Sequence, residues 1–258
     1  MNRRSAAFFS GLMFAMTAIA PAAGAAPSPA ACSVTATPAT AQSAILAAQT
    51  GDVVCLEAGV YRGPLRIDTK TGVTVRGAGA HETIVAGGDA DSLLVFRSRD
   101  IVIEDLKLFY GHPSNAYVWR STNIVFQRIH AGGGSLGIHF DLGSIGRVSE
   151  SSIYAMDGDG LLTRNASDVT AERNWIFNNG GVGVSTVGNN ATTAVTRNII
   201  SDNRGPGVFV GQTPCALLPA AVVEIPECYL SDLRRFVSNA TATLTANDEA
   251  PTGLVMPA

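Results

Sequence analysis

Residues 144–166 read SIGRVSESSIYAMDGDGLLTRNA, and residues 167–190 read SDVTAERNWIFNNGGVGVSTVGNN. Each stretch holds two segments in which apolar residues alternate with other residues: GRVSES and GLLT in the first, VTAERN and GVST in the second. Alternation over about five residues, bounded by Gly, Asn or Asp, is typical of β-strands joined by turns. The two stretches are therefore interpreted as successive copies of one strand-rich repeat.

The repeat extends along most of the chain in two columns of apolar residues. The first column comprises Val75, Ile103, Phe126, Val148, Ala171 and Val195, whose numbers differ successively by 28, 23, 22, 23 and 24. The second comprises Val95, Val118, Ile138, Leu161, Val184 and Val208, whose numbers differ successively by 23, 20, 23, 23 and 24. A common period of about 23 residues predicts an all-β solenoid, a parallel β-helix whose stacked apolar columns form the core.

The two ends of the solenoid differ from its middle. The segment Ala39 to Ala48 predicts a short helix that caps the first coil, because a solenoid must cover the exposed backbone of its first rung. The rhythm breaks after Gly211, and we expect an insertion at about 212–236. It resumes at Leu244 and Val255, each close to two periods after the last member of its column, which predicts a last partial coil. A simple C-terminal cap is the alternative.

The first residues have the pattern of an export signal. Asn2-Arg3-Arg4 precedes an uncharged run from Ala6 to Ala20, and Ala23-Gly24-Ala25 supplies a small-residue cleavage site. We expect residues 1–25 to be a signal peptide, 26–50 an N-terminal cap and 51–258 a single β-helix domain. The mature chain holds no later segment apolar enough to span a membrane. The predicted location is secreted or periplasmic.

Export allows disulfide bonds between the four cysteines. Four cysteines permit three pairings. Closeness in sequence favours Cys32 with Cys55 and Cys215 with Cys228, which would place one bridge near each end of the solenoid.

Composition narrows the class of partner. The net charge is −3, and only 15% of the residues are charged. Nucleic acid is an unfavourable partner for such a chain, because phosphate binding requires an electropositive surface.

The chain resembles the pectin-lyase-like right-handed β-helix superfamily. One branch of this superfamily comprises bacterial β-helix repeat proteins of unassigned activity. The resemblance lies in TGDVVCLEAGVYRG, in GVTVRGAGAHETIV and in the turns that follow each strand, and it covers about residues 45–210. It implies a right-handed parallel β-helix of about seven coils. It leaves activity open, since the superfamily includes polysaccharide lyases, hydrolases and epimerases, adhesins, and proteins without known activity.

Catalytic motifs of individual branches are absent from the sequence. The Gly-His-Gly of polygalacturonases, the Trp-x-Asp-His of pectate lyases and the Asp-Pro-His-Asp of alginate epimerases do not occur. Arg62 stands where pectin methylesterases carry Glu. The sequence therefore leaves open whether the protein is an enzyme.

Stacking of the coils nevertheless predicts one chemical cluster. Aligning Val118 with Ile138 places Trp119 beside His139 and Asp141 beside Arg164, on neighbouring rungs about 4.8 Å apart. Tyr117 belongs to the same face. Asp157 and Asp159 lie in the turn that leads to the strand of Arg164.

These residue types suit an acidic sugar. Tyr117 and Trp119 are expected to stack on a pyranose ring, and Arg164 to pair with a uronate carboxylate. His139, assisted by Asp141, would abstract the proton α to that carboxylate, as a lyase or an epimerase requires. No cofactor is required, and Asp157 and Asp159, with Asp141, are candidate ligands for calcium.

Three alternatives stay open for this face. It catalyses a reaction on an acidic polysaccharide, it binds the polysaccharide without chemistry, or it holds no active site. In the last case Asp141 and Arg164 form a surface ion pair and Asp157 and Asp159 are ordinary turn residues. The competing hypothesis for the whole protein is a non-catalytic structural or adhesive β-helix that binds another macromolecule.

Overall fold

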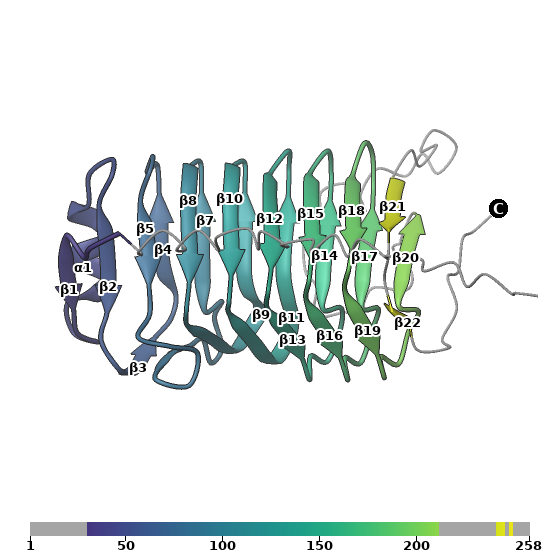
Figure 1. The fold of residues 1–258 in the computed structure, drawn as a ribbon, viewed down its shortest axis with the longest axis horizontal. Helices are drawn as coiled ribbons and strands as arrows, with labels where there is room; N and C mark the ends of the chain where they lie inside the picture. The colour runs from purple at the N-terminus through teal and green to yellow at the C-terminus, as the bar shows by residue number, and fades with distance from the viewer. Residues whose placement is uncertain (1–29, 212–240, 246–247, 250–258) are drawn as a thin grey trace, which may run out of the picture. The chain divides into compact units, whose positions relative to one another are not determined.

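The computed structural model describes residues 30–211, 241–245 and 248–249. Strands follow one another around an apolar interior on three faces, and each strand pairs in parallel with its equivalents in the neighbouring coils (Figure 1). The predicted parallel β-helix is therefore confirmed. The predicted signal peptide at 1–25 and insertion at 212–236 lie outside the described residues.

The first face is one nine-stranded sheet. Its strands are, in spatial order, β1 (Val34–Ala36), β2 (Val53–Leu56), β5 (Thr74–Arg76), β8 (Arg99–Glu104), β10 (Thr122–Gln127), β12 (Ile145–Ser149), β15 (Asp168–Glu172), β18 (Thr192–Thr196) and β21 (Thr241–Thr245).

The second and third faces share two long strands that run across the corner between them, β9 (Lys107–Trp119) and β11 (His130–Asp141). Beside the first halves of these strands, the second face holds β3 (Gly59–Arg62), β6 (Thr83–Ala86), β13 (Ser152–Tyr154), β16 (Trp175–Phe177), β19 (Ile199–Ser201) and β22 (Asp248–Glu249). Beside their second halves, the third face holds β4 (Leu65–Asp68), β7 (Leu93–Phe96), β14 (Leu161–Arg164), β17 (Val184–Val187) and β20 (Val208–Gly211). Seven coils thus carry strands on all three faces, in agreement with the expected number, and β21 and β22 begin an eighth.

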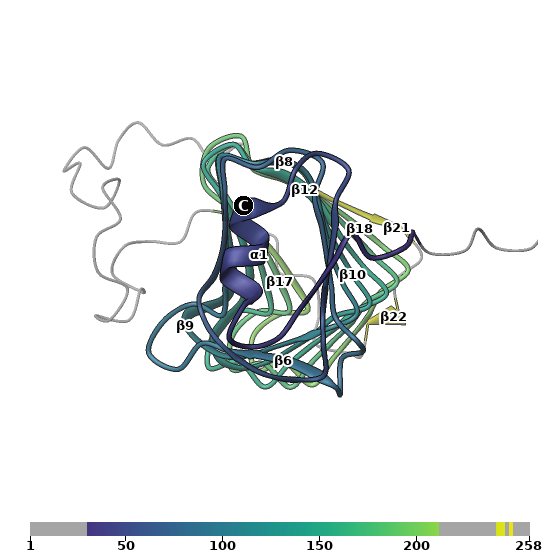
Figure 2. The same cartoon turned by 90° about the vertical axis from the view of Figure 1, so that its left-hand side faces the viewer.

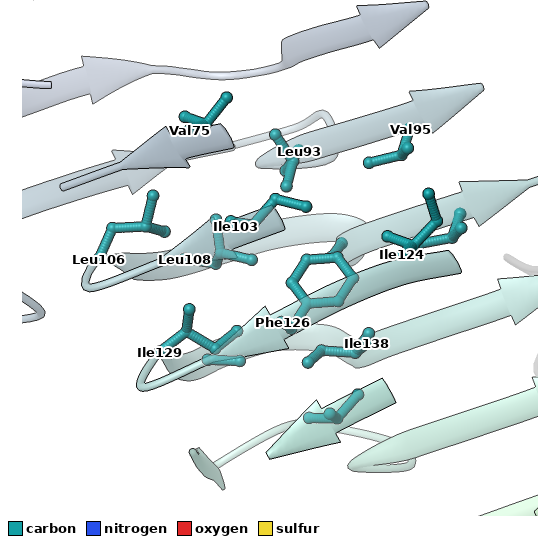
Figure 3. Close-up of a cluster of buried hydrophobic side chains, with 14 of the residues drawn as sticks. Val75, Leu93, Val95, Ile103, Leu106, Leu108, Ile124, Phe126, Ile129 and Ile138 are labelled. Carbon is teal, nitrogen blue, oxygen red and sulfur yellow. The ribbon is translucent and has the colours of Figure 1, made fainter. Parts of the chain in front are cut away.

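The first apolar column stacks as the sequence predicts. Val75 pairs with Ile103, Ile103 with Phe126, and the register continues without a slip to Val195. All six members are fully buried. Figure 3 shows Val75, Ile103 and Phe126 among the buried side chains of neighbouring coils, so the column forms part of the core.

In the second column, the alignment predicted from the sequence is wrong between one pair of coils. Ile138 pairs with Ala116 and Val118 pairs with Phe140, so the predicted alignment of Val118 with Ile138 is wrong by two residues. Side chains alternate with a period of two, so a slip of two residues keeps every apolar residue inward. The residue that actually pairs with Ile138 is Ala116. Because its side chain is small, the pattern of large apolar residues did not mark it as an inward position.

Corners between the first and second faces are made by single residues in left-handed backbone conformation. Five successive coils use a residue with φ between 52° and 57°, namely Asp105, Arg128, Glu150, Arg173 and Arg197. This conformation is unfavourable for residues that carry a Cβ. The pairing of the strands on both sides must therefore hold each corner in place.

Asparagines beside these corners link the coils. The Nδ2 of Asn174 donates to the backbone oxygen of Val148 and to Oδ1 of Asn198, both at 2.9 Å, and its Oδ1 accepts from the backbone N–H of Ser151 at 3.1 Å. Asn179 and Asn203 make the same kind of link farther along the coil, at 2.8 Å. These bonds all run from one coil to the next.

The N-terminal end of the coil is closed as expected. Helix α1 (Ala41–Ala47) lies across the first coil and buries Ala41 and Ile45 against the core (Figure 2). Cys32 and Cys55 form the predicted disulfide, with their Cα atoms 5.7 Å apart. Cys215 and Cys228 lie outside the described residues, so their pairing stays a prediction.

At the other end, β21 pairs with β18 and places Leu244 opposite Val195, as the resumed rhythm predicts. Val255 lies outside the described residues. Within the part of the chain that the structure describes, no helix is long and apolar enough to cross a membrane.

Replacing Asn174 with Ala should destabilise the protein by about 3 kcal/mol, because buried backbone groups of Val148 and Ser151 lose their partner at about 1–3 kcal/mol each. Asn174 is 2% exposed. Chemical denaturation measures the difference. Asn189→Ala, at an exposed position, is the matched control and should change the free energy of unfolding by less than about 0.5 kcal/mol. Equal stability of the two variants would contradict a coil-linking role for Asn174.

Candidate functional site

The residues predicted to form a site lie on the outward side of the third face, where β9 and β11 are neighbours. Tyr117 pairs with His139, and Trp119 pairs with Asp141. The predicted neighbours were Trp119 with His139, and this pairing is wrong because of the two-residue slip described above. The cluster itself survives the slip, because all four side chains remain on one side of two adjacent strands.

Tyr117, His139 and Asp141 contact one another directly. The ring centroids of Tyr117 and His139 are 4.9 Å apart. The Tyr117 hydroxyl donates to Oδ2 of Asp141 at 3.3 Å, and Nε2 of His139 lies 3.8 Å from the same oxygen. Together with Trp119 and Arg164, these residues are called the His139 site below.

The Asp141 carboxylate is held firmly on its other side. Its Oδ1 accepts from Nδ2 of Asn165 and from the backbone N–H of Leu142, each at 2.8 Å. Asp141 is 7% exposed and His139 is 8% exposed. Three donors fix the carboxylate beside the imidazole, which gives the two groups a defined relative position.

Burial governs the protonation of both aromatic groups in the site. It lowers the pKa of His139 to about 4, the charge of Asp141 opposes the shift, and the charge of Arg164 adds to it. Burial also raises the pKa of Tyr117, and the negative charge of Asp141 raises it further. At neutral pH the site therefore holds a neutral imidazole and a neutral phenol.

His139 also has an unsatisfied nitrogen. Among the described residues its Nε2 is buried and has no hydrogen-bond partner. Such an atom costs free energy in the folded state, because it gave up water without gaining a partner. A neutral imidazole with a free nitrogen is a group that can accept a proton.

Arg164 lies one coil farther along. Phe140 on β11 pairs with Thr163 on β14. Asp141 is the next residue after Phe140, and Arg164 is the next residue after Thr163. Its charge acts on the pKa values of both Tyr117 and His139. Asp141 and Arg164 therefore each follow one member of a paired position on neighbouring strands, and the role of Arg164 stays a prediction.

Aromatic rings extend the site toward the N-terminal coils. Phe96 makes edge-to-face contacts with Tyr117 and Trp119, at centroid distances of 5.9 and 5.8 Å. The guanidinium of Arg66 lies 5.0 Å over Phe96, and that of Arg120 lies 4.5 Å over Trp119. The sequence pointed to Tyr117 and Trp119 but not to these cations, whose positions depend on the fold.

Asp91 is a further residue that the sequence did not single out. It lies in the turn before β7, and its Oδ1 accepts from the backbone N–H of Ser114 at 2.9 Å. Burial raises the pKa of Asp91 to about 6, and its charge reaches Tyr117. Its sequence signal is weak, since an Asp in a turn is common.

The acidic turn residues do not fit a calcium site. Oδ1 of Asp159 accepts from the backbone N–H of Val182 at 2.8 Å, and burial raises its pKa. Asp157 is exposed. Calcium takes six to eight oxygen ligands, and no group of three or more His, Cys, Asp or Glu side chains suited to a metal ion occurs within the described residues.

Comparison with known proteins identifies the fold. The family model described as "Right handed beta helix region" matches residues 71–217. No curated protein matches the sequence. Similar solved structures include the A-module of a mannuronan C-5 epimerase from Azotobacter vinelandii, with a TM-score of 0.56, 21% identity, and coverage of 69% of this chain and 56% of that one.

Two lyases have similar folds over more of their length. An alginate lyase from Paenibacillus has a TM-score of 0.54 and 18% identity, with 85% of this chain and 96% of that chain covered. A pectate lyase from Bacillus in complex with trigalacturonate has a TM-score of 0.59 and 14% identity, with 86% and 82% covered. At these identities the likeness is one of fold, and the chain spans little more than half the length of the epimerase module.

His139 should make the stability of the protein depend on pH. Its pKa is about 4 in the folded state against 6.5 for the free side chain, so the unfolded chain takes up the proton first as the pH falls. The free energy of unfolding should therefore fall between pH 6.5 and 4, by about 3 kcal/mol from this residue alone. Denaturant titrations at several pH values measure the slope.

His139→Gln should flatten that slope, whereas Asn189→Gln, at an exposed position, should leave it unchanged. An identical slope in the wild type and in His139→Gln would show that the imidazole is not buried in its neutral form.

Proposed function

The chain belongs to the right-handed β-helix family, and from this premise we propose that it is an exported protein that binds or acts on an acidic polysaccharide. The polysaccharide lies along the outward side of β7, β9, β11 and β14. The observation that carries the proposal is the combination of aromatic rings in mutual contact and guanidinium groups on this face.

Trp119 and Tyr117 supply the apolar part of the binding surface. Both are partly exposed, and Phe96 supports both through its edge-to-face contacts. A pyranose ring presents C–H groups that pack on such rings. Because the rings already contact one another, little side-chain freedom is lost when a sugar binds.

Arg120 and Arg164 supply the charge. Arg120 is exposed and holds no acidic partner in the described ranges, and its guanidinium stacks on Trp119. A planar guanidinium can form two parallel hydrogen bonds to one carboxylate. A uronate ring stacked on Trp119 therefore has a cation for its carboxylate beside it.

The solved relatives support the ligand class without fixing it. One is a mannuronan epimerase, one an alginate lyase, and one a pectate lyase bound to trigalacturonate. All three names refer to polymers of acidic sugars. The same fold in this chain presents aromatic and cationic side chains on an outer face, which is why we extend that ligand class to it.

Catalysis, in addition to binding, would require His139 to act as a base. In a lyase or an epimerase, a base removes the proton at C5 of the uronate. In β-elimination the C5–H electrons form the C4–C5 double bond as the C4–O bond breaks, and the leaving oxygen takes a proton from water. In epimerisation water returns a proton to C5 on its opposite face. Neutral His139 would accept the proton at Nε2, and Asp141 would stabilise the resulting imidazolium.

Whether the site binds a sugar or also catalyses a reaction depends on whether the sugar can reach His139. His139 is only 8% exposed, whereas Tyr117 and Trp119 reach the surface. A sugar stacked on the rings would have to displace part of the site before its C5 proton reached Nε2. Binding is therefore the activity that the geometry supports best, with catalysis as a second proposal that rests on the unsatisfied nitrogen of His139.

Export is proposed from the signal-like pattern of residues 1–25, and the disulfide between Cys32 and Cys55 supports it. Disulfides persist in oxidising compartments such as the periplasm and the extracellular space. Acidic polysaccharides occur in the same places.

Trp119→Ala should weaken binding of polygalacturonate or alginate about tenfold or more, because an aromatic anchor at the centre of a contact carries much of the affinity. Calorimetric titration with purified polymers measures this change. Ile145→Ala removes an apolar side chain, 47% exposed on the first face, and should bind like the wild type. Wild-type affinity in Trp119→Ala would move the binding surface elsewhere.

Catalysis is tested by following the ultraviolet absorbance of unsaturated uronate and the proton NMR spectrum of the polymer. Any product should disappear in His139→Gln, because Gln cannot accept the C5 proton. Product that survives His139→Gln would contradict the assignment of the base.

A further inference from the structure

A second group of aromatic rings lies on the outward side of the second face. The rings of Tyr154 on β13 and Phe177 on β16 are stacked, with centroids 5.3 Å apart and planes inclined by 15°. Trp175, two residues before Phe177, stacks on it at 4.0 Å and 23°. Three rings from two coils therefore form one continuous stack.

The end of this stack is open to solvent. Trp175 is 49% exposed, and Ile199, its neighbour on the next coil, is 50% exposed. Both side chains line an open depression of about 390 Å³, together with Arg173 and Arg197. Two half-exposed apolar side chains thus lie beside two guanidinium groups, and Glu150 also lines the depression.

The two arginines differ in how their charge is used. Arg173 is bound to Glu150 at 3.1 Å and to Glu172 at 2.6 Å. Among the described residues, Arg197 meets the Glu172 carboxylate at 3.8 Å, and its side chain is 63% exposed. Arg197 is therefore the cation that can turn to an incoming anion.

We propose that Trp175, Ile199 and Arg197 form a second binding surface for an acidic polysaccharide, separate from the His139 site. The ligand class rests on the proposed function. A uronate ring packs on Trp175 and Ile199, and its carboxylate accepts hydrogen bonds from the Arg197 guanidinium. This group of three residues is called the Trp175 surface below.

Spacing favours a polymer as the occupant. Trp175 and Ile199 are partners on adjacent strands, so they repeat along the coil axis at about 4.8 Å, a spacing comparable to the length of one pyranose residue. A chain lying along the axis thus meets one side chain per sugar. The distance between neighbouring coils thus determines the spacing between the side chains that contact successive sugars.

Area disfavours a second copy of the protein as the occupant. Ser152 precedes Trp175 in its row, so Trp175 and Ile199 are exposed apolar side chains of two successive coils. Stable protein interfaces bury at least about 1,000 Å² in total, whereas a single aromatic side chain supplies about 150–250 Å².

The chain contains two tryptophans, and each belongs to one of the two surfaces. In Trp119→Phe the fluorescence reports only on Trp175, and in Trp175→Phe only on Trp119. Each variant is titrated with a galacturonate hexamer and with the same hexamer fully methyl-esterified. We expect the Trp175 emission to shift with the acidic hexamer and to respond at least about threefold more weakly to the neutral one.

A charge variant sharpens the test. In the Trp119→Phe background, Arg197→Gln should weaken the response of Trp175 about threefold or more. Arg99→Gln, on β8 of the first face and 65% exposed, is the matched control and should leave the response unchanged. An Arg197→Gln response equal to that of the control would overturn the role of the cation.

The remaining outcomes separate the two surfaces. A response of Trp119 without any response of Trp175 would overturn the Trp175 surface and leave the proposed function standing. A response of Trp175 alone would support the Trp175 surface and overturn the His139 site as the binding surface. Silence of both tryptophans would overturn both proposals, and a Trp175 emission that depends on protein concentration without sugar would assign the surface to a second copy of the chain.

Discussion

Parallel hydrogen bonding from one coil to the next is the constraint on which the structure depends. Each strand can satisfy its backbone only through the strands above and below it, so equivalent positions must stack in register. The first face keeps one register from Val75 to Val195 without interruption. The left-handed corners then recur at the same place in five successive coils, and Asn174 and Asn198 follow the last two of these corners.

The same constraint builds both proposed surfaces. Tyr117 and His139 belong to successive coils and meet because their strands pair, and Trp175 and Ile199 meet in the same way. No loop or second domain has to bring these residues together within the described ranges. An outward row of side chains in such a coil is a linear array, a form suited to a linear polymer.

Sequence periodicity reveals the fold but not every contact. The alternation of apolar residues and the regular length of the repeat suffice for the core position of Phe126, for helix α1 and for the proximity of Tyr117, His139 and Asp141. They cannot detect a slip of two residues, because Ile138 stays inward whether it faces Val118 or Ala116. Asp91 and the ring stack at Trp175 were missed for a related reason. The burial of Asp91 and the orientation of the rings cannot be deduced from the spacing of residues in the sequence.

The central claim is that an acidic glycan lies on the third face over Trp119. A crystal structure of the protein with a bound galacturonate hexamer tests it most directly. The account predicts sugar rings packed on Trp119 and Tyr117, with a carboxylate within hydrogen-bond distance of Arg120 or Arg164. A hexamer bound only on another face, with the rings of Trp119 and Tyr117 left uncovered, would contradict it.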